Sequence, residues 1–556
     1  MATQVWGDYL DKETTKRLMQ ASEGNPLFVV EMVQSGVWAT PAEAMPDSDN
    51  ESQTLPPKVY AVIQHRLTQL SPEARQLVAL AATIGRSFAF GVLVQASGKG
   101  EDEIVTALDE LWQRRIIREQ GAHEYDFGHD CIREAAYSEL SAIRRKHLHQ
   151  RVANALETIY LNDIDTVCGQ LAMHHERAGN VQDAIHWYQQ AAEVAWHLNA
   201  FSDATNHLRT ALKLLLGIAP THEIMALELK LQIRFTEFIT TATGFTHPER
   251  HAAFLRAKQL AVTLQDMDSL VFILSQLVGT YIVMGDPKQV SAVNKQADAI
   301  VDRLESVQSK VTICRLGASV ARYRGDFLRA TALYTEGLKF CESAYQQTNA
   351  LSVHIECIKT RLLMAISLWL NGYPQQAANL AQSCHAQRSE VTDLNDSTVM
   401  MFQAALFWRN LGKVANLTVE AEQMLALGTK YEIALARQSG SVFSGWLLAK
   451  QGQLSAGIAL ICQGIDGFRR MGHAMYQTHR LAMLVEMLLW TAEYKKADKI
   501  LQEAFDISER RGERFWDVEL YRLQGDLLLA QGEPDKRTEA AYLRAIKIAQ
   551  QQGAKS

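Results

Sequence analysis

The sequence predicts an all-α fold, in which a long solenoid of helical hairpins follows a small N-terminal domain that also contains short strands. Three observations support this fold class. The chain has 556 residues, more than one hydrophobic core usually organises. Hydrophobic residues make up 47% and charged residues 21%, which is ordinary for a soluble globular protein. A repeat of nearly constant period fills the second half, which indicates an array of similar units.

The repeat is marked by equivalent positions at 290, 330, 377, 417, 457, 497 and 538, spaced by 40, 47, 40, 40, 40 and 41 residues. Glycine turns such as Gly412 and Gly452 are expected to end the first helix of each pair. The period exceeds the ~34 residues of a minimal tetratricopeptide unit and overlaps that of HEAT repeats. The Leu-x-Gly-x-Leu and Ala-x-x-Tyr/Leu-x-x-Ala patterns favour long tetratricopeptide units. We therefore expect an extended, curved, right-handed superhelix of antiparallel helix pairs between about residues 165 and 550.

The N-terminal part divides into three stretches. Residues 1–38 are predicted to form one or two helices, and the proline-rich, acidic residues 39–58 a flexible linker. In residues 59–160, a helix from Val59 precedes a second that Ser71 caps and Gly85 closes. A third helix, residues 101–113, leads into two strand-like runs at 116–119 and 125–127. Three helices and a hairpin describe a winged helix, which the solenoid follows over residues 161–556.

Charge argues against nucleic acid as a partner of this chain. The net charge is −6, and the helix that would read DNA in a winged helix carries five acids: Glu101, Asp102, Glu103, Asp109 and Glu110. These carboxylates would repel a phosphate backbone. The basic run at residues 144–151 is interpreted as the solvated face of a helix whose apolar side carries Leu148, Val152 and Leu156.

The seven cysteines show neither a CxxC pair nor the spacing of a metal site, so they are predicted to be small core residues in a reducing compartment. No signal sequence opens the chain, and no run is expected to be long enough to span a bilayer. We therefore expect a cytoplasmic protein without a membrane partner and without a bound metal.

Two short motifs are candidates for a nucleotide site. Gly24-Asn25-Pro26-Leu27 is a turn that starts a helix, and Phe127-Gly128-His129-Asp130 lies just before a helix that continues through Ile132. Asp130 could cap that helix. A histidine at a helix start lies beside free backbone N–H groups and the positive end of the dipole, where a phosphate can bind. The alternative is that His129 only hydrogen-bonds a neighbouring turn.

These motifs resemble the Gly-x-Pro-Leu and Met-His-Asp-type motifs of STAND signalling ATPases, and above all of bacterial regulators that join such an ATPase to tetratricopeptide repeats. MalT-like and BTAD-type transcriptional activators and predicted ATPases associated with class III cyclases belong to that group. The resemblance implies that residues 1–38 end an ATPase lid and that residues 59–160 are its winged helix. It also implies that Pro26 packs on the adenine and that His129 contacts the β-phosphate of ADP.

Two repeat segments are also similar to segments typical of these bacterial proteins. They are residues 243–249, Thr-Gly-Phe-Thr-His-Pro-Glu, and residues 512–525, which begin Gly-Glu-Arg-Phe-Trp-Asp. The residues that bind an effector on the inner surface of the repeats cannot be selected from the sequence.

The sequence contains no phosphate-loop motif of an ATPase. Gly98-Lys99-Gly100 fails the phosphate-loop pattern because it has neither the upstream glycine nor a following Ser or Thr. We therefore expect no catalytic residue, and ADP or ATP bound only together with a nucleotide-binding core that would precede Met1. The expected function is the sensor portion of a STAND-type ATPase that controls transcription. Its repeats would bind an effector or a protein partner, with self-assembly. A cyclase-linked sensor and a stand-alone scaffold for protein–protein interaction remain alternatives.

Overall fold

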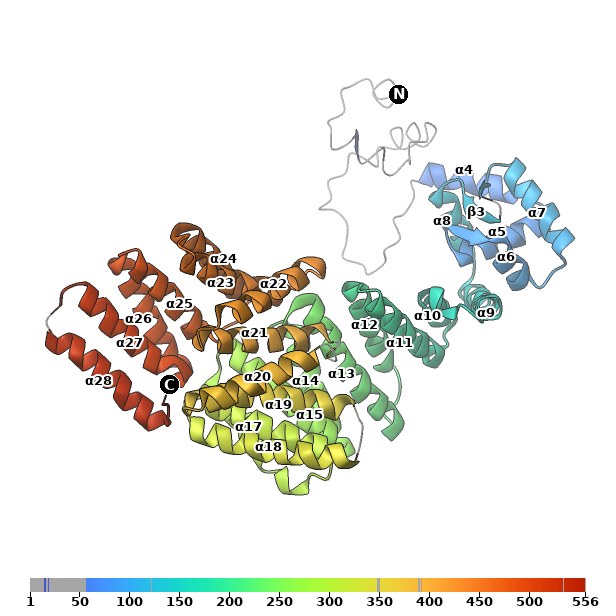
Figure 1. Cartoon of the computed structure of the whole chain (residues 1–556). Coiled ribbons are helices and arrows are strands. Elements are labelled where there is room, and N and C mark those ends of the chain that lie inside the picture. The colour runs from blue at the N-terminus through green and yellow to red at the C-terminus, as the bar shows by residue number, and fades with distance from the viewer. Residues whose placement is uncertain are drawn as a thin grey trace. The chain divides into compact units, whose positions relative to one another are not determined.

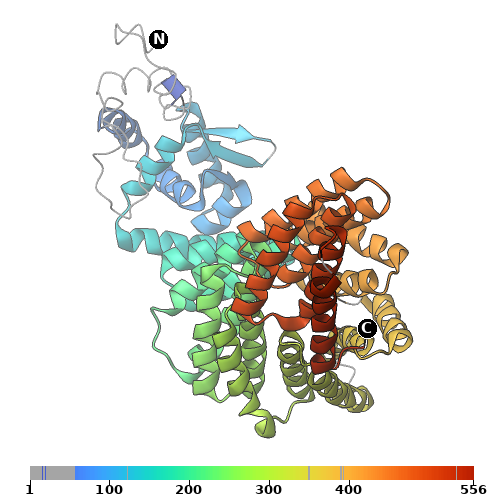
Figure 2. The same ribbon diagram turned by 90° about the vertical axis from the view of Figure 1, so that its left-hand side faces the viewer.

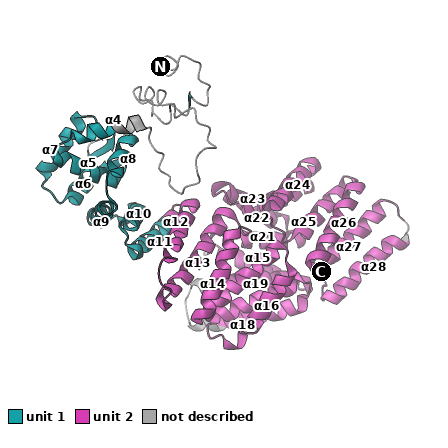
Figure 3. Cartoon of the chain, turned by 180° about the vertical axis from the view of Figure 1, so that it is seen from behind, with its two compact units in different colours: residues 1–194 teal, residues 195–556 magenta. Residues whose placement is uncertain are grey.

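The computed structural model describes residues 15, 16, 19, 57–121, 123–347, 351–388, 391, 393–533 and 535–555 (Figure 1). It is 81% helical, which confirms the all-α class. The chain divides into two compact units, residues 1–194 and 195–556 (Figure 3). Pro26 and the helices predicted for residues 1–38 lie outside the described residues, apart from three positions of the latter.

Unit 1 contains helices around a small sheet. Its elements in chain order are α4 (Pro57–Thr68), α5 (Pro72–Ile84), β1 (Ser87–Ala89), α6 (Phe90–Ser97), α7 (Glu101–Gln113), β2 (Ile117–Gln120), β3 (Glu124–Phe127), α8 (Asp130–Ser138), α9 (Ala142–Ile159), η3 (Ile164–Thr166), α10 (Cys168–Ala178) and α11 (Val181–His197), whose last residues pass into unit 2. The predicted Ser71 cap is present, because its side chain accepts a hydrogen bond from the backbone of Ala74.

The sheet has the order β1-β3-β2 with both pairs antiparallel. The hairpin of β2 and β3 is the predicted one, with Ile117 opposite Phe127. The sequence did not predict β1 or α6. The strand β1 pairs Phe88 with Tyr125, so its formation depends on a partner 37 positions later. It is only three residues long, too short to show the alternation of apolar and polar residues that marks a strand.

Unit 2 is built from paired helices. They are α12 (Phe201–Leu215), α13 (His222–Thr243), α14 (Pro248–Leu264), α15 (Met267–Met284), α16 (Pro287–Asp298), η4 (Val301–Arg303), α17 (Val307–Tyr323), α18 (Phe327–Gln347), α19 (Leu351–Leu370), α20 (Pro374–Gln387), α21 (Leu394–Asn410), α22 (Val414–Lys430), α23 (Ala434–Lys450), α24 (Leu454–Arg470), α25 (Gln477–Trp490), α26 (Tyr494–Arg511), η6 (Arg514–Trp516), α27 (Asp517–Ala530) and α28 (Asp535–Gln552). The described residues contain no strand after Phe127.

The predicted repeat positions have one structural meaning. Each is the fourth residue of the second helix in its pair and is buried: Val290, Ala330, Ala377, Leu417, Gly457, Ala497 and Thr538. The turn glycines adopt left-handed backbone, as with φ 89° at Gly452, which lets the first helix end and the second return. Unit 2 therefore has a tetratricopeptide-like helical repeat fold with units of about forty residues.

The repeats of unit 2 contact distant repeats as well as their neighbours. The Thr246 hydroxyl donates to the Met471 carbonyl at 2.6 Å, and the Ala474 N–H donates to the Val283 carbonyl at 2.7 Å. The Lys555 N–H reaches the Leu370 carbonyl at 2.7 Å, so the end of the chain lies beside α19 (Figures 1 and 2). The expectation of an extended superhelix is wrong, because contacts between residues 185 to 225 positions apart close unit 2 on itself.

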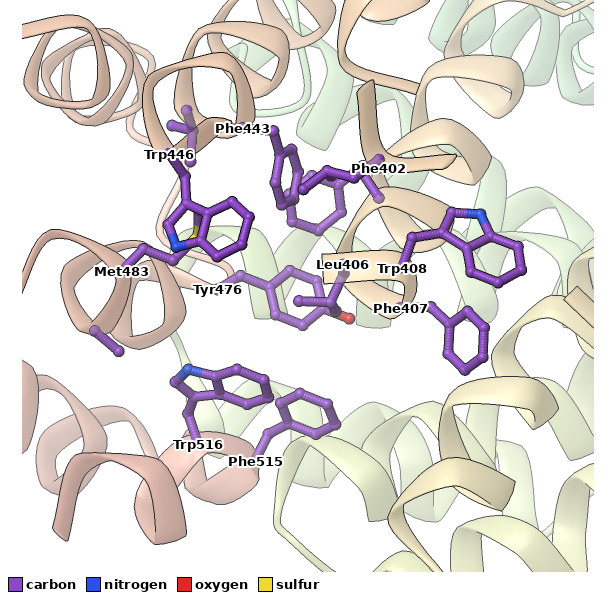
Figure 4. Packing of buried hydrophobic residues seen from close by; sticks show 14 of the residues in the cluster. Phe402, Leu406, Phe407, Trp408, Phe443, Trp446, Tyr476, Met483, Phe515 and Trp516 are labelled. Carbon is purple, nitrogen blue, oxygen red and sulfur yellow. The ribbon is translucent and has the colours of Figure 1, made fainter. Parts of the chain in front are cut away.

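Buried aromatic residues of unit 2 pack together in one cluster (Figure 4). The Tyr476 ring lies 5.2 Å from that of Phe402 and 6.1 Å from that of Phe515, centroid to centroid. Phe515 in turn stacks on Trp516 at 5.1 Å with the rings 7° apart. Because these rings come from α21, from the start of α25 and from η6, the cluster joins repeats that are far apart in sequence.

Two expectations about unit 2 need correction. Cys341 of α18 and Cys357 of α19 form a disulfide, so these two cysteines are not the unpaired core residues expected. The helix α15 is long and apolar enough to cross a membrane by length and composition, contrary to the expectation that no such run exists. Ten of its residues are buried, mostly among those of α14, α16 and α17, which is the packing of a core helix.

Candidate ligand cavity inside unit 2

A cavity of about 230 Å³ lies inside unit 2. Its wall is formed by the helices α14, α15, α17, α19, α21 and α23, and by the segments that precede α14, α25 and α27. A second cavity, of about 580 Å³, adjoins it and shares wall residues that include Phe245, Arg250 and Arg315. The closure of the repeats creates this interior, because Phe245 and Phe515 meet at one cavity although 270 positions separate them.

Arg250 is the most deeply buried cation of the cavity wall, with 1% of its surface exposed. Its Nε donates to Thr240 Oγ1 at 2.6 Å, and its Nη1 donates to Thr280 Oγ1 at 2.5 Å and to the Phe245 carbonyl at 3.2 Å. All three acceptors are neutral, and no carboxylate of the described chain pairs with this guanidinium. Burial therefore lowers the pKa of Arg250 to about 10.

Arg322 of α17 is held in a similar way. It is 3% exposed, and its Nη2 donates to the Tyr476 hydroxyl at 2.8 Å, while Nη1 lies 3.4 Å from Gln403 Oε1. The guanidinium carbon lies 5.3 Å from the centre of the Phe515 ring, a cation–π distance. Like Arg250, it has no carboxylate partner among the described residues.

The other cations near the cavities are neutralised. Arg315 pairs with Glu356 at 2.9 Å, and Lys359 bridges Glu356 at 3.1 Å and Asp396. Within the described part of the chain, Arg250 and Arg322 are therefore the two wall cations whose charge no direct ion pair balances. A buried charge without a counter-ion costs free energy, and such a cost is common where a ligand supplies the counter-charge.

Glu513 adds a carboxylic acid to the same wall. It is 2% exposed; its Oε1 accepts a hydrogen bond from the Thr478 hydroxyl, whereas its Oε2 has no partner in the described chain. Burial, partly offset by Thr478 and Arg480, raises the pKa of Glu513 to about 7. This acid is therefore largely neutral below pH 7 and adds little negative charge there.

The residues predicted for the nucleotide site are placed only in part. His129 lies in unit 1 as the N-cap of α8, with extended backbone and no capping hydrogen bond from its side chain. Asp130, which the sequence suggested as the cap, instead pairs with Arg133 at 2.7 Å. Pro26 lies outside the described residues, so the expectation that Pro26 and His129 face one cavity stays a prediction.

Sequence reasoning missed Arg250 and Arg322. No pattern within α14 or α17 marks them, because helical periodicity does not reveal which other helices cover a given face. A partial signal existed, because residues 243–249 and 512–525 were singled out by resemblance. The structure places Phe245 from the first and Glu513 and Phe515 from the second in one cavity wall.

No family model matches the chain. An uncharacterized protein of Rhizobium meliloti (strain 1021) is 25% identical over 98% of this chain, and the chain spans about half (53%) of its length.

Solved structures with similarity include a STAND protein with a tetratricopeptide repeat sensor from Pyrococcus horikoshii, at 12% identity and a TM-score of 0.37 over 98% of this chain and 70% of that one. A Rap protein complexed with competence and sporulation factor is similar at 11% identity and 0.44, over 60% and 88%. The quorum sensor NprR of B. thuringiensis is similar at 9% and 0.39, over 74% and 99%. At these TM-scores the likenesses carry nothing about what this chain binds.

Proposed function

We propose that this chain is the regulatory and sensor portion of a STAND-type signalling ATPase that controls transcription, and that the interior of unit 2 binds its effector. The observation that carries the proposal is the interior cavity lined by Arg250 and Arg322, two buried cations without a carboxylate partner among the described residues. A scaffold that only displayed its outer surface would gain nothing from burying them. Binding energy in this interior can change a switch only through different affinities for its two states.

Unit 1 is proposed to be the lid that such a switch moves. Its order of helix, strand, two helices and hairpin supports a winged helix, and the acids at the start of α7 disfavour DNA as its ligand. His129 at the start of α8 supports the proposed contact with the β-phosphate of ADP, since a helix N-terminus favours anions. Pro26 is proposed as the adenine contact, and a nucleotide-binding core outside this chain as the source of the phosphate loop.

Two related functions remain as alternatives. The same sensor could control an adenylate or guanylate cyclase, or the chain could be a stand-alone repeat scaffold that binds a protein. The cavity favours an effector sensor over a scaffold, but it does not separate transcription from cyclase output, because the output domain would lie elsewhere. We propose a cytoplasmic location for all three.

We expect this chain alone to bind ADP weakly or not at all, because a phosphate loop normally provides most contacts to the phosphates. Joined to its nucleotide-binding core, the protein should bind ADP tightly. His129→Ala should then weaken ADP binding by about ten- to a hundredfold, the effect of losing a charge-assisted hydrogen bond. Calorimetric titration of ADP into the joined protein measures both affinities.

The matched control is His123→Ala, which removes an exposed histidine from the β2–β3 turn of the same unit. It should leave the ADP affinity unchanged. Equal affinities for the wild type and the His129 variant would remove His129 from the site, and a loss of stability alone would assign it to pinning the turn.

A further inference from the structure

We propose that the interior of unit 2 selects a small organic anion, a carboxylate joined to an apolar body, with the carboxylate bound by Arg250 and Arg322. The inference rests on the proposed sensor role and specifies the chemical class of its effector. Both guanidinium groups line one cavity, and the described chain gives neither a carboxylate. A ligand carboxylate would supply the counter-charge that the described residues do not provide.

The hydrogen-bond partners of Arg250 and Arg322 are neutral. They orient the two guanidinium groups but leave the positive charges unbalanced. Thr240, Thr280 and the Phe245 carbonyl hold two nitrogens of Arg250, and its Nη2 makes no hydrogen bond to the described residues. The Tyr476 hydroxyl likewise holds Arg322. Preorganised donors of this kind bind a planar carboxylate without first breaking an ion pair.

The rest of the wall suits an apolar body. Val278, Ile282 and Leu316 contribute aliphatic side chains, and Phe245, Tyr323 and Phe515 contribute aromatic ones. A volume of about 230 Å³ lies just below the roughly 300–1,000 Å³ of drug-sized sites, so the ligand is a small metabolite or the end of a short peptide. The adjoining cavity of about 580 Å³ gives room for the remainder of a peptide.

Gly279 offers a way to close the cavity without touching either arginine. It lies on the wall in α15, and a side chain added there meets nothing within 4 Å. Gly279→Leu should therefore fill the cavity while α15 stays helical, since leucine is a better helix former than glycine.

The test is calorimetric titration of the full chain with phenylbutyrate, with N-acetylphenylalanine as a mimic of a peptide C-terminus, and with phenylbutanol as a neutral isostere. At least one carboxylate should bind, and phenylbutanol should bind at least about tenfold more weakly. Tighter binding of phenylbutyrate indicates a free metabolite, and tighter binding of N-acetylphenylalanine indicates a peptide. Binding of neither carboxylate, or equal binding of the alcohol, would overturn the inference.

Arg250→Gln and Arg322→Gln should each weaken carboxylate binding by about ten- to a hundredfold. Arg322→Lys should weaken it by less, because lysine keeps the positive charge but lacks the paired N–H donors of the guanidinium group. The control is Arg480→Gln. Arg480 is equally buried, but it donates to the backbone carbonyls of Met475 and His473 and lies outside the wall.

Circular dichroism establishes that each variant is folded, and if the arginine variants unfold, Gly279→Leu decides. It should abolish carboxylate binding, and retained affinity would contradict the site. The carboxylate titrations test this inference separately from the proposed nucleotide contact. Carboxylate binding without any effect of His129→Ala on ADP would leave this inference standing and remove His129 from the nucleotide site. An effect of His129→Ala on ADP without carboxylate binding would overturn this inference and leave the proposed nucleotide contact standing.

Discussion

Gly457→Val should lower the free energy of unfolding of unit 2 by about 3 kcal/mol or more, in the upper range of overpacking substitutions. A side-chain carbon added at Gly457 in α24 would lie 2.5 Å from the Gly445 carbonyl oxygen and 2.9 Å from the Ala449 nitrogen of α23. Both atoms belong to the backbone of the facing helix, so neither can move aside as a flexible side chain can. The two helices would have to separate and lose contact along their length.

The matched control is Gly279→Ala. This glycine is also helical, but its added carbon meets nothing within 4 Å, so alanine should stabilise by about 0.5–1 kcal/mol through helix propensity. Urea unfolding followed by circular dichroism measures both changes. A loss of similar size at Gly279, or no loss at Gly457, would show that the close crossing of α23 and α24 does not limit the stability of unit 2.

Acid should destabilise unit 1 through a buried pair of histidines. His149 of α9 and His174 of α10 are at most 1% exposed, and their Nδ1 atoms lie 2.8 Å apart; the Tyr137 hydroxyl lies 2.8 Å from His149 Nε2. Burial and nearby arginines lower the pKa of His149 to about 4, and burial and His149 lower that of His174 to about 3. The fold therefore holds both rings neutral.

The direction of the pH effect follows from where protons bind. Below the ordinary histidine pKa of 6.5, both histidines bind protons in the unfolded chain but stay neutral in the folded unit. The contribution of the pair to the free energy of unfolding is therefore full above pH 6.5 and falls as the pH decreases toward 4 and 3. The total loss is of order several kcal/mol. Labelling of the buried Cys168 in α10 by a dithiodipyridine, located by mass spectrometry, should accelerate as pH falls from about 7 to 5.

His174→Gln should make the opening of unit 1 less dependent on pH, because only one of the two buried groups that bind a proton on unfolding then remains. The variant should also be less stable at neutral pH. His147→Asn is the control on α9, since that histidine is exposed. It should leave the pH dependence as in the wild type. An unchanged pH dependence in His174→Gln would mean that other groups control the acid lability.

Local signals in the sequence predicted local structure well. The acidic run and its apolar spacing define α7 at Glu101–Gln113 as expected, and the repeat positions all fall at the fourth residue of a second helix. Such features depend on neighbours within a few positions, which a single sequence displays. His149 shows the limit, because a basic run interpreted as a solvated face contains one of the most buried histidines of unit 1.

The closure of unit 2 and its cavity could not be predicted. Whether the repeats extend or close depends on small rotations that accumulate from one unit to the next, and no pattern within a repeat records their sum. Arg250 therefore carried no local signal of its burial. Its role follows only from the rings and threonines that surround it, which come from α13, α15 and the Phe245 segment.

The closed interior of unit 2 is the central claim, and a designed cross-link tests it most directly. A side-chain carbon added at Gly472 would lie 3.9 Å from that of Thr246, within the spacing of a disulfide, although 226 positions separate the two residues. Thr246→Cys combined with Gly472→Cys should form a disulfide within one chain under mild oxidation. Mass spectrometry of the unreduced digest would detect the joined peptides. An open, extended solenoid would hold the two cysteines apart, and the absence of that cross-link in the folded protein would contradict the cavity and the sensor role built on it.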